Sequence, residues 1–262
     1  MTLPIIALIA LLAGLAAAAA VWIFTSQRGA PTGATYAASR FVVPAVAFVV
    51  AAAIVGGALF ALGRAPGAGG DGPERKVLEA IQRHHPEAAA DIAAIRRETD
   101  YAVAQRRSSE LAQRYLPRHI PTTSDGAVIR FTSEMTKVFE NLTERDPESC
   151  KALASGGRVG ATFDSAQMRP ALDAMAQVID DSVDSPQPPP RPERAQQLLT
   201  TVVERVYAGK TDLATPQQLM QPAVVPAAQL CRTMVAFYRE ILKLPAADAS
   251  AVLRTLMRSG TR

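Results

Sequence analysis

Two cysteines and three histidines are among the few side chains in this chain that could support nucleophilic, redox or metal chemistry. Cys150 lies in the stretch TERDPESCKAL, where Asp146-Pro147-Glu148 supplies a helix N-cap, a first-turn proline and a first-turn acid. A thiol in the first turn of a helix has a lowered pKa, which makes Cys150 a candidate reactive cysteine. Cys231 lies far along the chain without a histidine beside it, so the cysteines alone do not form a zinc site.

Both cysteines occupy apolar helix faces, which favours a structural role. Cys150 shares a face with Leu153, and Cys231 shares one with Met234 and Ile241. Two such cysteines normally form a disulfide in an oxidising compartment and remain reduced in the cytosol. We therefore expect a Cys150–Cys231 disulfide if this part of the chain lies outside the cytoplasm. If it lies inside, we expect two small, inert, buried side chains.

The histidines do not have the spacing of metal ligands. His84 and His85 are adjacent, so on a helix their side chains point about 100° apart and chelate poorly. Helical zinc sites instead place histidines four residues apart. We predict that His84 and His85 form a solvated helix end before Pro86, and that His119 is likewise solvated in a proline-flanked loop. No metal and no other cofactor is expected.

No catalytic motif appears in the sequence. There is no G-x-S-x-G nucleophile motif, and the glycine-rich stretch SGGRVGA lacks the G-K-[ST] of a phosphate-binding loop. The neighbouring carboxylates Asp180 and Asp181 are expected on a solvated helix end. Glycoside hydrolysis needs two acids that converge across a cleft, which a sequence does not reveal. We therefore assign no catalytic residue.

Basic side chains recur on one predicted helix at Arg96, Arg107 and Arg114. This spacing approximates one stripe, which could face anionic headgroups or an acidic partner. A solvated face is the alternative. The net charge is +4, of which three arginines before Asp71 supply +3, so residues 71–262 carry only +1. Nucleic acid is therefore not an expected partner, because its binders need a net basic domain or a clustered patch.

Two apolar runs without charge, residues 3–24 and 41–62, are each long enough to cross a bilayer. Polar residues with glycine and proline separate them and can turn the chain. The pattern predicts a transmembrane hairpin over residues 1–64, with the lipid bilayer as a partner, and then a flexible Gly/Pro tether over 65–73. A cleaved signal peptide is the alternative, but the positive n-region that it needs is absent.

The charges flanking these runs predict an orientation. The loop between them carries Arg28 and Arg40 without an acid, which favours a cytoplasmic loop. The rest of the chain would then lie in the periplasm, although Arg64, Arg75 and Lys76 favour the opposite orientation. Abundant alanine and arginine suggest a GC-rich bacterial genome. We expect a multi-pass protein of the bacterial inner membrane with a periplasmic domain.

Apolar residues spaced three and four apart predict helices after the tether. They are expected at 74–84, 87–115 (ending before Pro117), 128–142, just before Cys150, 168–183, 198–206, 230–241 and 252–256. A proline-rich connector, 184–192, divides this part into halves, 74–183 and 193–262. The predicted fold class is all-α, a transmembrane hairpin followed by a soluble multi-helix domain. Whether the halves form one domain or two is left open.

These patterns favour a binding role over catalysis. The first hypothesis is a non-enzymatic binding or scaffold protein of the cell envelope, with a protein partner there. The second is a membrane-tethered hydrolase whose acidic site is not recognisable from sequence. The third is a regulatory module that faces the cytosol.

Overall fold

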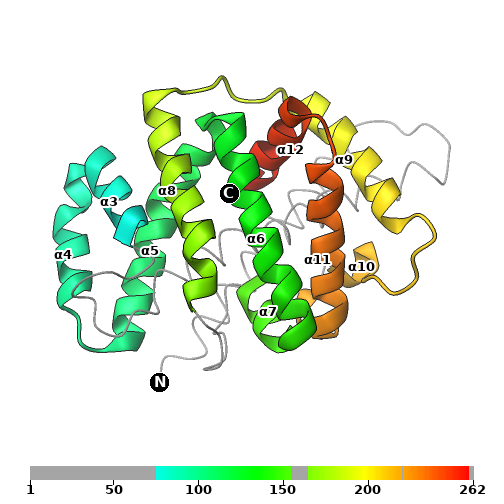
Figure 1. Cartoon of the computed structure of the whole chain (residues 1–262), viewed down its shortest axis with the longest axis horizontal. Coiled ribbons are helices and arrows are strands. Elements are labelled where there is room, and N and C mark those ends of the chain that lie inside the picture. Colours follow the sequence, from blue (N-terminus) through cyan, green and yellow to red (C-terminus); the bar gives the residue numbers. More distant parts are fainter. Residues whose placement is uncertain (1–74, 155–164, 220, 260–262) are drawn as a thin grey trace, which may run out of the picture. The chain divides into compact units, whose positions relative to one another are not determined.

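The computed structural model describes residues 75–154, 165–219 and 221–259 (Figure 1). The predicted hairpin and tether lie outside these residues. Within the described ranges every regular element is a helix, which confirms the all-α prediction there. No helix in these ranges is both long and apolar enough to cross a membrane.

The described chain contains ten α-helices. They are α3 (Arg75–His84), α4 (Ala89–Arg97), α5 (Tyr101–His119), α6 (Asp125–Arg145), α7 (Pro147–Ala154), α8 (Arg169–Asp184), α9 (Pro192–Tyr207), α10 (Pro216–Leu219), α11 (Ala227–Leu242) and α12 (Ala246–Ser259). Short 3₁₀ turns lie between some of them: η1 (Pro86–Ala88), η2 (Ile120–Thr122), η3 (Ser165–Met168) and η4 (Pro222–Val224).

The helix predicted over 87–115 is wrong, because the chain breaks at Glu98–Asp100 and forms α4 and α5 instead. Two acidic side chains stabilise the break. Glu98 Oε1 accepts hydrogen bonds from the backbone N–H groups of Thr99 and Asp100, at 3.1 and 3.2 Å. Asp100 Oδ1 accepts from the N–H of Val103 at 3.2 Å and so caps α5.

Helix α5 also runs through Pro117, where the sequence predicts an end. A proline inside a helix removes one backbone hydrogen bond. Here the helix continues because Tyr115, Leu116 and Ile120 around the proline are all buried. Burying each large apolar side chain gains about 1.5–3 kcal/mol, which outweighs one bond in the last turn. His119 is thereby placed at the end of a helix instead of in a loop.

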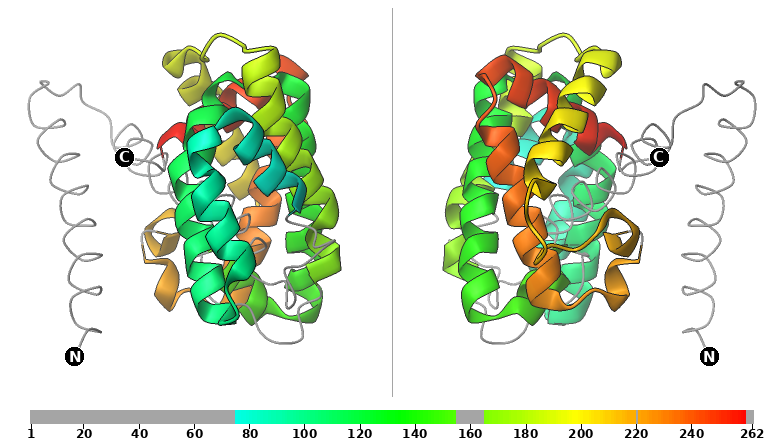
Figure 2. Two further views of the ribbon diagram at one scale, coloured as in Figure 1. Left: turned by 90° about the vertical axis from the view of Figure 1, so that its left-hand side faces the viewer. Right: turned by 90° about the vertical axis from the view of Figure 1, so that its right-hand side faces the viewer.

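Helix α6 lies at the centre of the described helices and packs against α8, α11 and α12 (Figures 1 and 2). Its apolar stripe buries Phe131 and Phe139, and the Phe139 ring stacks on the buried Tyr238 of α11 at a centroid distance of 6.1 Å. The predicted amphipathic helix over 128–142 is thus confirmed. Buried residues from before and after the proline-rich connector belong to one hydrophobic cluster.

The connector itself is non-helical over residues 185–191, as its prolines predict. Arg254 of α12 joins it to the start of α6. This side chain is only 8% exposed and donates to the carbonyl oxygens of Thr123 and Pro188, both at 3.3 Å, and to Asp125 Oδ1 at 3.1 Å. A buried guanidinium with three oxygen partners fixes the relative positions of α12, the connector and α6.

Candidate functional site

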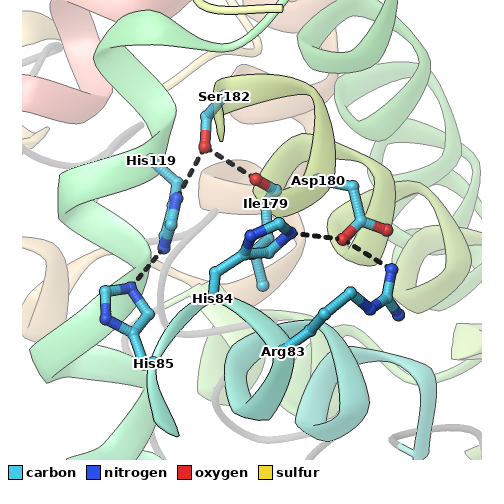
Figure 3. A network of polar contacts seen from close by, with 7 residues as sticks. All are labelled: Arg83, His84, His85, His119, Ile179, Asp180 and Ser182. Carbon is cyan, nitrogen blue, oxygen red and sulfur yellow. Dashed lines mark hydrogen bonds and ion pairs between the residues drawn. The ribbon is translucent and has the colours of Figure 1, made fainter. Parts of the chain in front are cut away.

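A polar cluster joins three helices through histidine side chains (Figure 3). His84 is the last residue of α3, His85 follows it before η1, and His119 is the last residue of α5. Asp180 and Ser182 lie in the last turns of α8. The cluster therefore gathers side chains that lie almost 100 residues apart in the sequence, where α3 and the end of α5 pack on α8.

One branch of the cluster is a chain of short contacts. His85 Nε2 lies 2.8 Å from His119 Nε2, and His119 Nδ1 lies 2.6 Å from Ser182 Oγ. Ser182 Oγ donates in turn to the carbonyl oxygen of Ile179 at 2.7 Å. At the other end, His85 Nδ1 lies 3.1 Å from Glu87 Oε1.

The proton positions in this branch follow from its two ends. The single hydroxyl proton of Ser182 goes to the Ile179 carbonyl, so His119 Nδ1 must donate to Ser182 Oγ. At the opposite end an ionised Glu87 only accepts, so His85 Nδ1 must donate to it. Both Nδ1 atoms then carry hydrogen, and the facing Nε2 atoms form a hydrogen bond only when one further proton lies between them.

The second branch holds Asp180. Its Oδ1 atom lies 2.9 Å from His84 Nε2 and 3.0 Å from Nη1 of Arg83. His84 is mostly buried, with 12% of its side chain exposed, whereas Arg83 is 58% exposed. One carboxylate thus bridges the end of α3 to α8 beside the His85–His119 pair (Figure 3).

His119 is the buried titratable group of the cluster, with 5% of its surface exposed. Burial lowers its pKa from 6.5 to about 4, and the positive charges of His85, His84 and Arg118 act in the same direction. Asp180 acts in the opposite direction without overcoming them. His119 is therefore neutral at neutral pH, in agreement with a Nδ1–H that donates to Ser182 and a free Nε2 acceptor.

The prediction that the histidines are solvated is wrong. His119 is buried, and His84 and His85 are mostly covered. Asp180 is also partly buried in contacts with α3, and Asp181 accepts a hydrogen bond from Ser124, so neither is a freely solvated carboxylate. The sequence held one signal for His119, because it lies three and four residues after the apolar Leu116 and Tyr115. It falls on their buried face once the helix continues past the proline.

The distance between the two facing imidazoles fits a hydrogen bond better than a shared metal ion. Within the described ranges, no three His, Cys, Asp or Glu side chains gather closely enough to hold a metal. The Nε2 atoms of His85 and His119 are 2.8 Å apart, whereas two imidazoles on one tetrahedral zinc stand about 3.3 Å apart at ordinary bond lengths. The separation is that of a hydrogen bond.

The two cysteines lie apart from the histidine cluster, between α7 and α11. Their sulfur atoms are 2.10 Å apart, the distance of a disulfide, and both residues are fully buried. The predicted helix start positions the first of them, because α7 begins at Pro147 and Asp146 Oδ1 accepts from the Ser149 N–H at 3.1 Å. Cys150 is therefore buried, whereas a reactive cysteine must be accessible.

The predicted basic stripe is divided between two helices. Arg96 lies on α4, whereas Arg107 and Arg114 lie on α5. Arg107 is 3.7 Å from Glu98, and Arg114 is 3.1 Å from Asp91, so two of the three arginines have acidic partners. Binding of an anionic surface by these residues remains a prediction.

The histidine cluster can bind and release protons, whereas the cysteine pair can be oxidised and reduced. Neither arrangement contains the nucleophile, base and oxyanion donors of a recognisable catalytic site. No protein-family model matches this chain, and neither a curated protein nor a solved structure is significantly similar to it.

Proposed function

We propose that this chain is a membrane-anchored helical binding or scaffold protein whose described domain is displayed outside the cytoplasm. The observation that carries the proposal is the cysteine pair. Cys150 and Cys231 lie on opposite sides of the proline-rich connector, yet their buried sulfur atoms are at disulfide distance. Such pairs persist in oxidising compartments and are rare in the cytosol, so the geometry supports an envelope location.

The two uncharged runs before residue 64 supply the proposed anchor. A cross-link between α7 and α11 suits a domain that must keep its shape without cytosolic chaperones. The partners of the proposed protein are the lipid bilayer and a protein of the envelope.

The two carboxyl groups with shifted pKa values, Glu79 and Glu87, do not support the hydrolase alternative. A general acid needs a carboxyl pKa raised by burial or by a neighbouring carboxylate. The pKa of Glu79 is held below its usual range by a hydrogen bond from Arg75. The pKa of Glu87 is lowered first by a backbone hydrogen bond and then by His85. Both shifts run opposite to what a general acid requires.

Reporter fusions at residue 262 test the proposed location. Alkaline phosphatase is active only outside the cytoplasm and green fluorescent protein fluoresces only inside it, so the proposal requires activity from the first fusion alone. Thiol trapping of the native chain, with an acid quench before alkylation, should find both cysteines blocked. The C150A/C231A variant is the matched control, because it has no thiol to trap and should keep the same orientation. Fluorescence of the cytosolic reporter with two alkylated thiols would overturn the proposal and favour the cytosol-facing module.

A further inference from the structure

We propose that the His85–His119 pair is a proton-operated latch, which holds the segment α3–α4 on α5 and α8 and loosens it in acid. The proposal concerns a property of the described domain that the location and binding role proposed above do not include. It rests on the geometry of one contact and on the charges around it.

The latch is a hydrogen bond that allows only one proton. With both Nδ1 atoms donating, to Glu87 and to Ser182, one shared proton joins the Nε2 atoms at 2.8 Å. A second proton would place two N–H groups head to head and two positive charges within one contact. The bond would then become a repulsion, and His85 would be pushed away from the end of α5.

The charges that face the pair do not offset that repulsion. His84 comes from α3, Arg118 from α5 and Asp180 from α8, and Glu87 lies beside His85 at η1. His84 and Arg118 both lower the pKa of His119 and so oppose a further proton on it. Asp180 favours it, but its carboxylate is already bound by His84 and Arg83.

Three further groups surround the pair without adding a free negative charge. Residues 120–122 of η2, which follow His119 directly, are uncharged. Asp181 of α8 accepts from Ser124. The Tyr115 ring packs on His85 at a centroid distance of 4.4 Å and is itself covered by Arg118. The two anions beside the pair are thus already bound, Glu87 by His85 and Asp180 by His84 and Arg83.

The latch acts on a segment that is also held by an apolar stripe, by the contacts of Asp180 with α3, and by the Arg114–Asp91 ion pair. Helix α3 packs on α8 and buries Val77, Leu78 and Ile81. Its outer ion pair, Lys76 with Asp173, is exposed and stabilises little. The polar contacts at its end are the ones that respond to pH. Because α3 is the first described helix after the predicted tether, its loosening would lengthen the link between the proposed anchor and the remaining helices.

The size of the effect follows from the titration of His119. An opened segment returns this imidazole to its ordinary pKa of 6.5, from about 4 in the closed state. A base with a lowered pKa stabilises the closed state fully above pH 6.5, and this contribution is lost as the pH falls toward 4. Through His119 alone, linkage makes the opening equilibrium rise about 15-fold between pH 6.5 and pH 5, and about 80-fold by pH 4. This range starts at pH 6.5 because the bond needs its one shared proton, which is lost at alkaline pH. The buried face of α3 keeps the open state a minority, so the readout must detect rare opening.

Hydrogen exchange of the full-length chain in lipid nanodiscs tests the latch. Exchange rates corrected for intrinsic pH dependence give opening constants for α3 and α4, with the amides of α11 as the internal reference. The latch requires the α3–α4 constants to rise about 15-fold from pH 6.5 to pH 5 while those of α11 change much less. In H119N, where an amide can still donate to Ser182 but cannot titrate, the pH dependence of α3–α4 should be much weaker than in the wild type. A flat wild-type profile, or an H119N profile as steep as that of the wild type, overturns the proposal.

A second measurement covers the case in which H119N does not fold. In the wild-type chain, ¹⁵N shifts of labelled histidine report both the tautomer and the titration of each ring. His119 should be a Nδ1–H tautomer that titrates well below pH 6. A Nε2–H tautomer or titration at pH 6.5 or above contradicts the latch. Exchange repeated with EDTA and with Zn²⁺ tests whether a proton or a metal ion joins the Nε2 atoms of His85 and His119. Loss of α3 protection in EDTA at neutral pH would show that a metal joins them and would overturn the proposal.

Discussion

Reducing the bond between Cys150 and Cys231 should destabilise the described domain strongly. The two residues are 81 positions apart, and a cross-link over such a loop lowers the chain entropy of the unfolded state. The loop-entropy relation gives about 4.5 kcal/mol at 25 °C for a loop of this length. Single domains have free energies of unfolding of about 5–15 kcal/mol, so this one bond would supply a large share of the total.

Urea denaturation monitored by circular dichroism measures this effect. Two samples of the wild-type chain are compared. One stays oxidised, and the other is reduced with dithiothreitol in urea, where the buried bond is accessible, and is then refolded in dithiothreitol. Each sample is then unfolded in urea. At an m value of about 2 kcal/mol/M, the midpoint should fall by about 2 M on reduction. The C150A/C231A variant is the control, because its transition should not respond to dithiothreitol and should lie at or below that of the reduced wild type.

The reasoning would be refuted by a wild-type midpoint that does not move on complete reduction, with both thiols verified by alkylation. That result would mean that the α7–α11 contact is stable through packing alone. Two free thiols in the native chain, purified without a reductant, would refute the bond itself.

Three single substitutions test the side-chain contacts around α6. Arg254→Met removes a buried cation from two carbonyl oxygens and Asp125, and should lower the free energy of unfolding by about 3 kcal/mol, seen as a fall of about 6–12 °C in Tm. Ser124→Ala removes the side chain that accepts from the Ala127 N–H and donates to Asp181, and should cost about 1–2 kcal/mol in urea denaturation. Lys137→Ala on the same helix removes only an exposed ion pair and should change stability by less than about 0.5 kcal/mol. Equal losses in the last two variants would contradict the assigned cap.

Most helices were predictable because their signals are local. The apolar spacing of α6 and the Asp-Pro-Glu start of α7 lie within a few residues of the helices that they specify. The break at 98–100 was missed although Asp100 is a good N-cap residue, because the alanine-rich sequence on both sides favours a continuous helix. The continuation through Pro117 was missed because burial on other helices overrides a local proline signal.

The candidate site was less predictable than the helices that carry it. The sequence contains His84, His85 and His119, but a solvated helix end and a buried cluster have the same local pattern. What decides between them is Ser182 and Asp180 of α8, which meet the histidines only after α3 and α5 pack on that helix. No spacing rule connects these residues.

The sequence by itself determined the helical periodicity, the uncharged runs before residue 64, the proline-rich connector and the inward position of both cysteines. These features depend on neighbours along the chain, and on which face of one helix a side chain occupies. The tertiary structure alone decided that Cys150 meets Cys231 and that His85 faces His119 across one proton. Such contacts join distant segments, and they are chosen by the packing of whole helix faces, whose burial energy far exceeds that of any single polar pair.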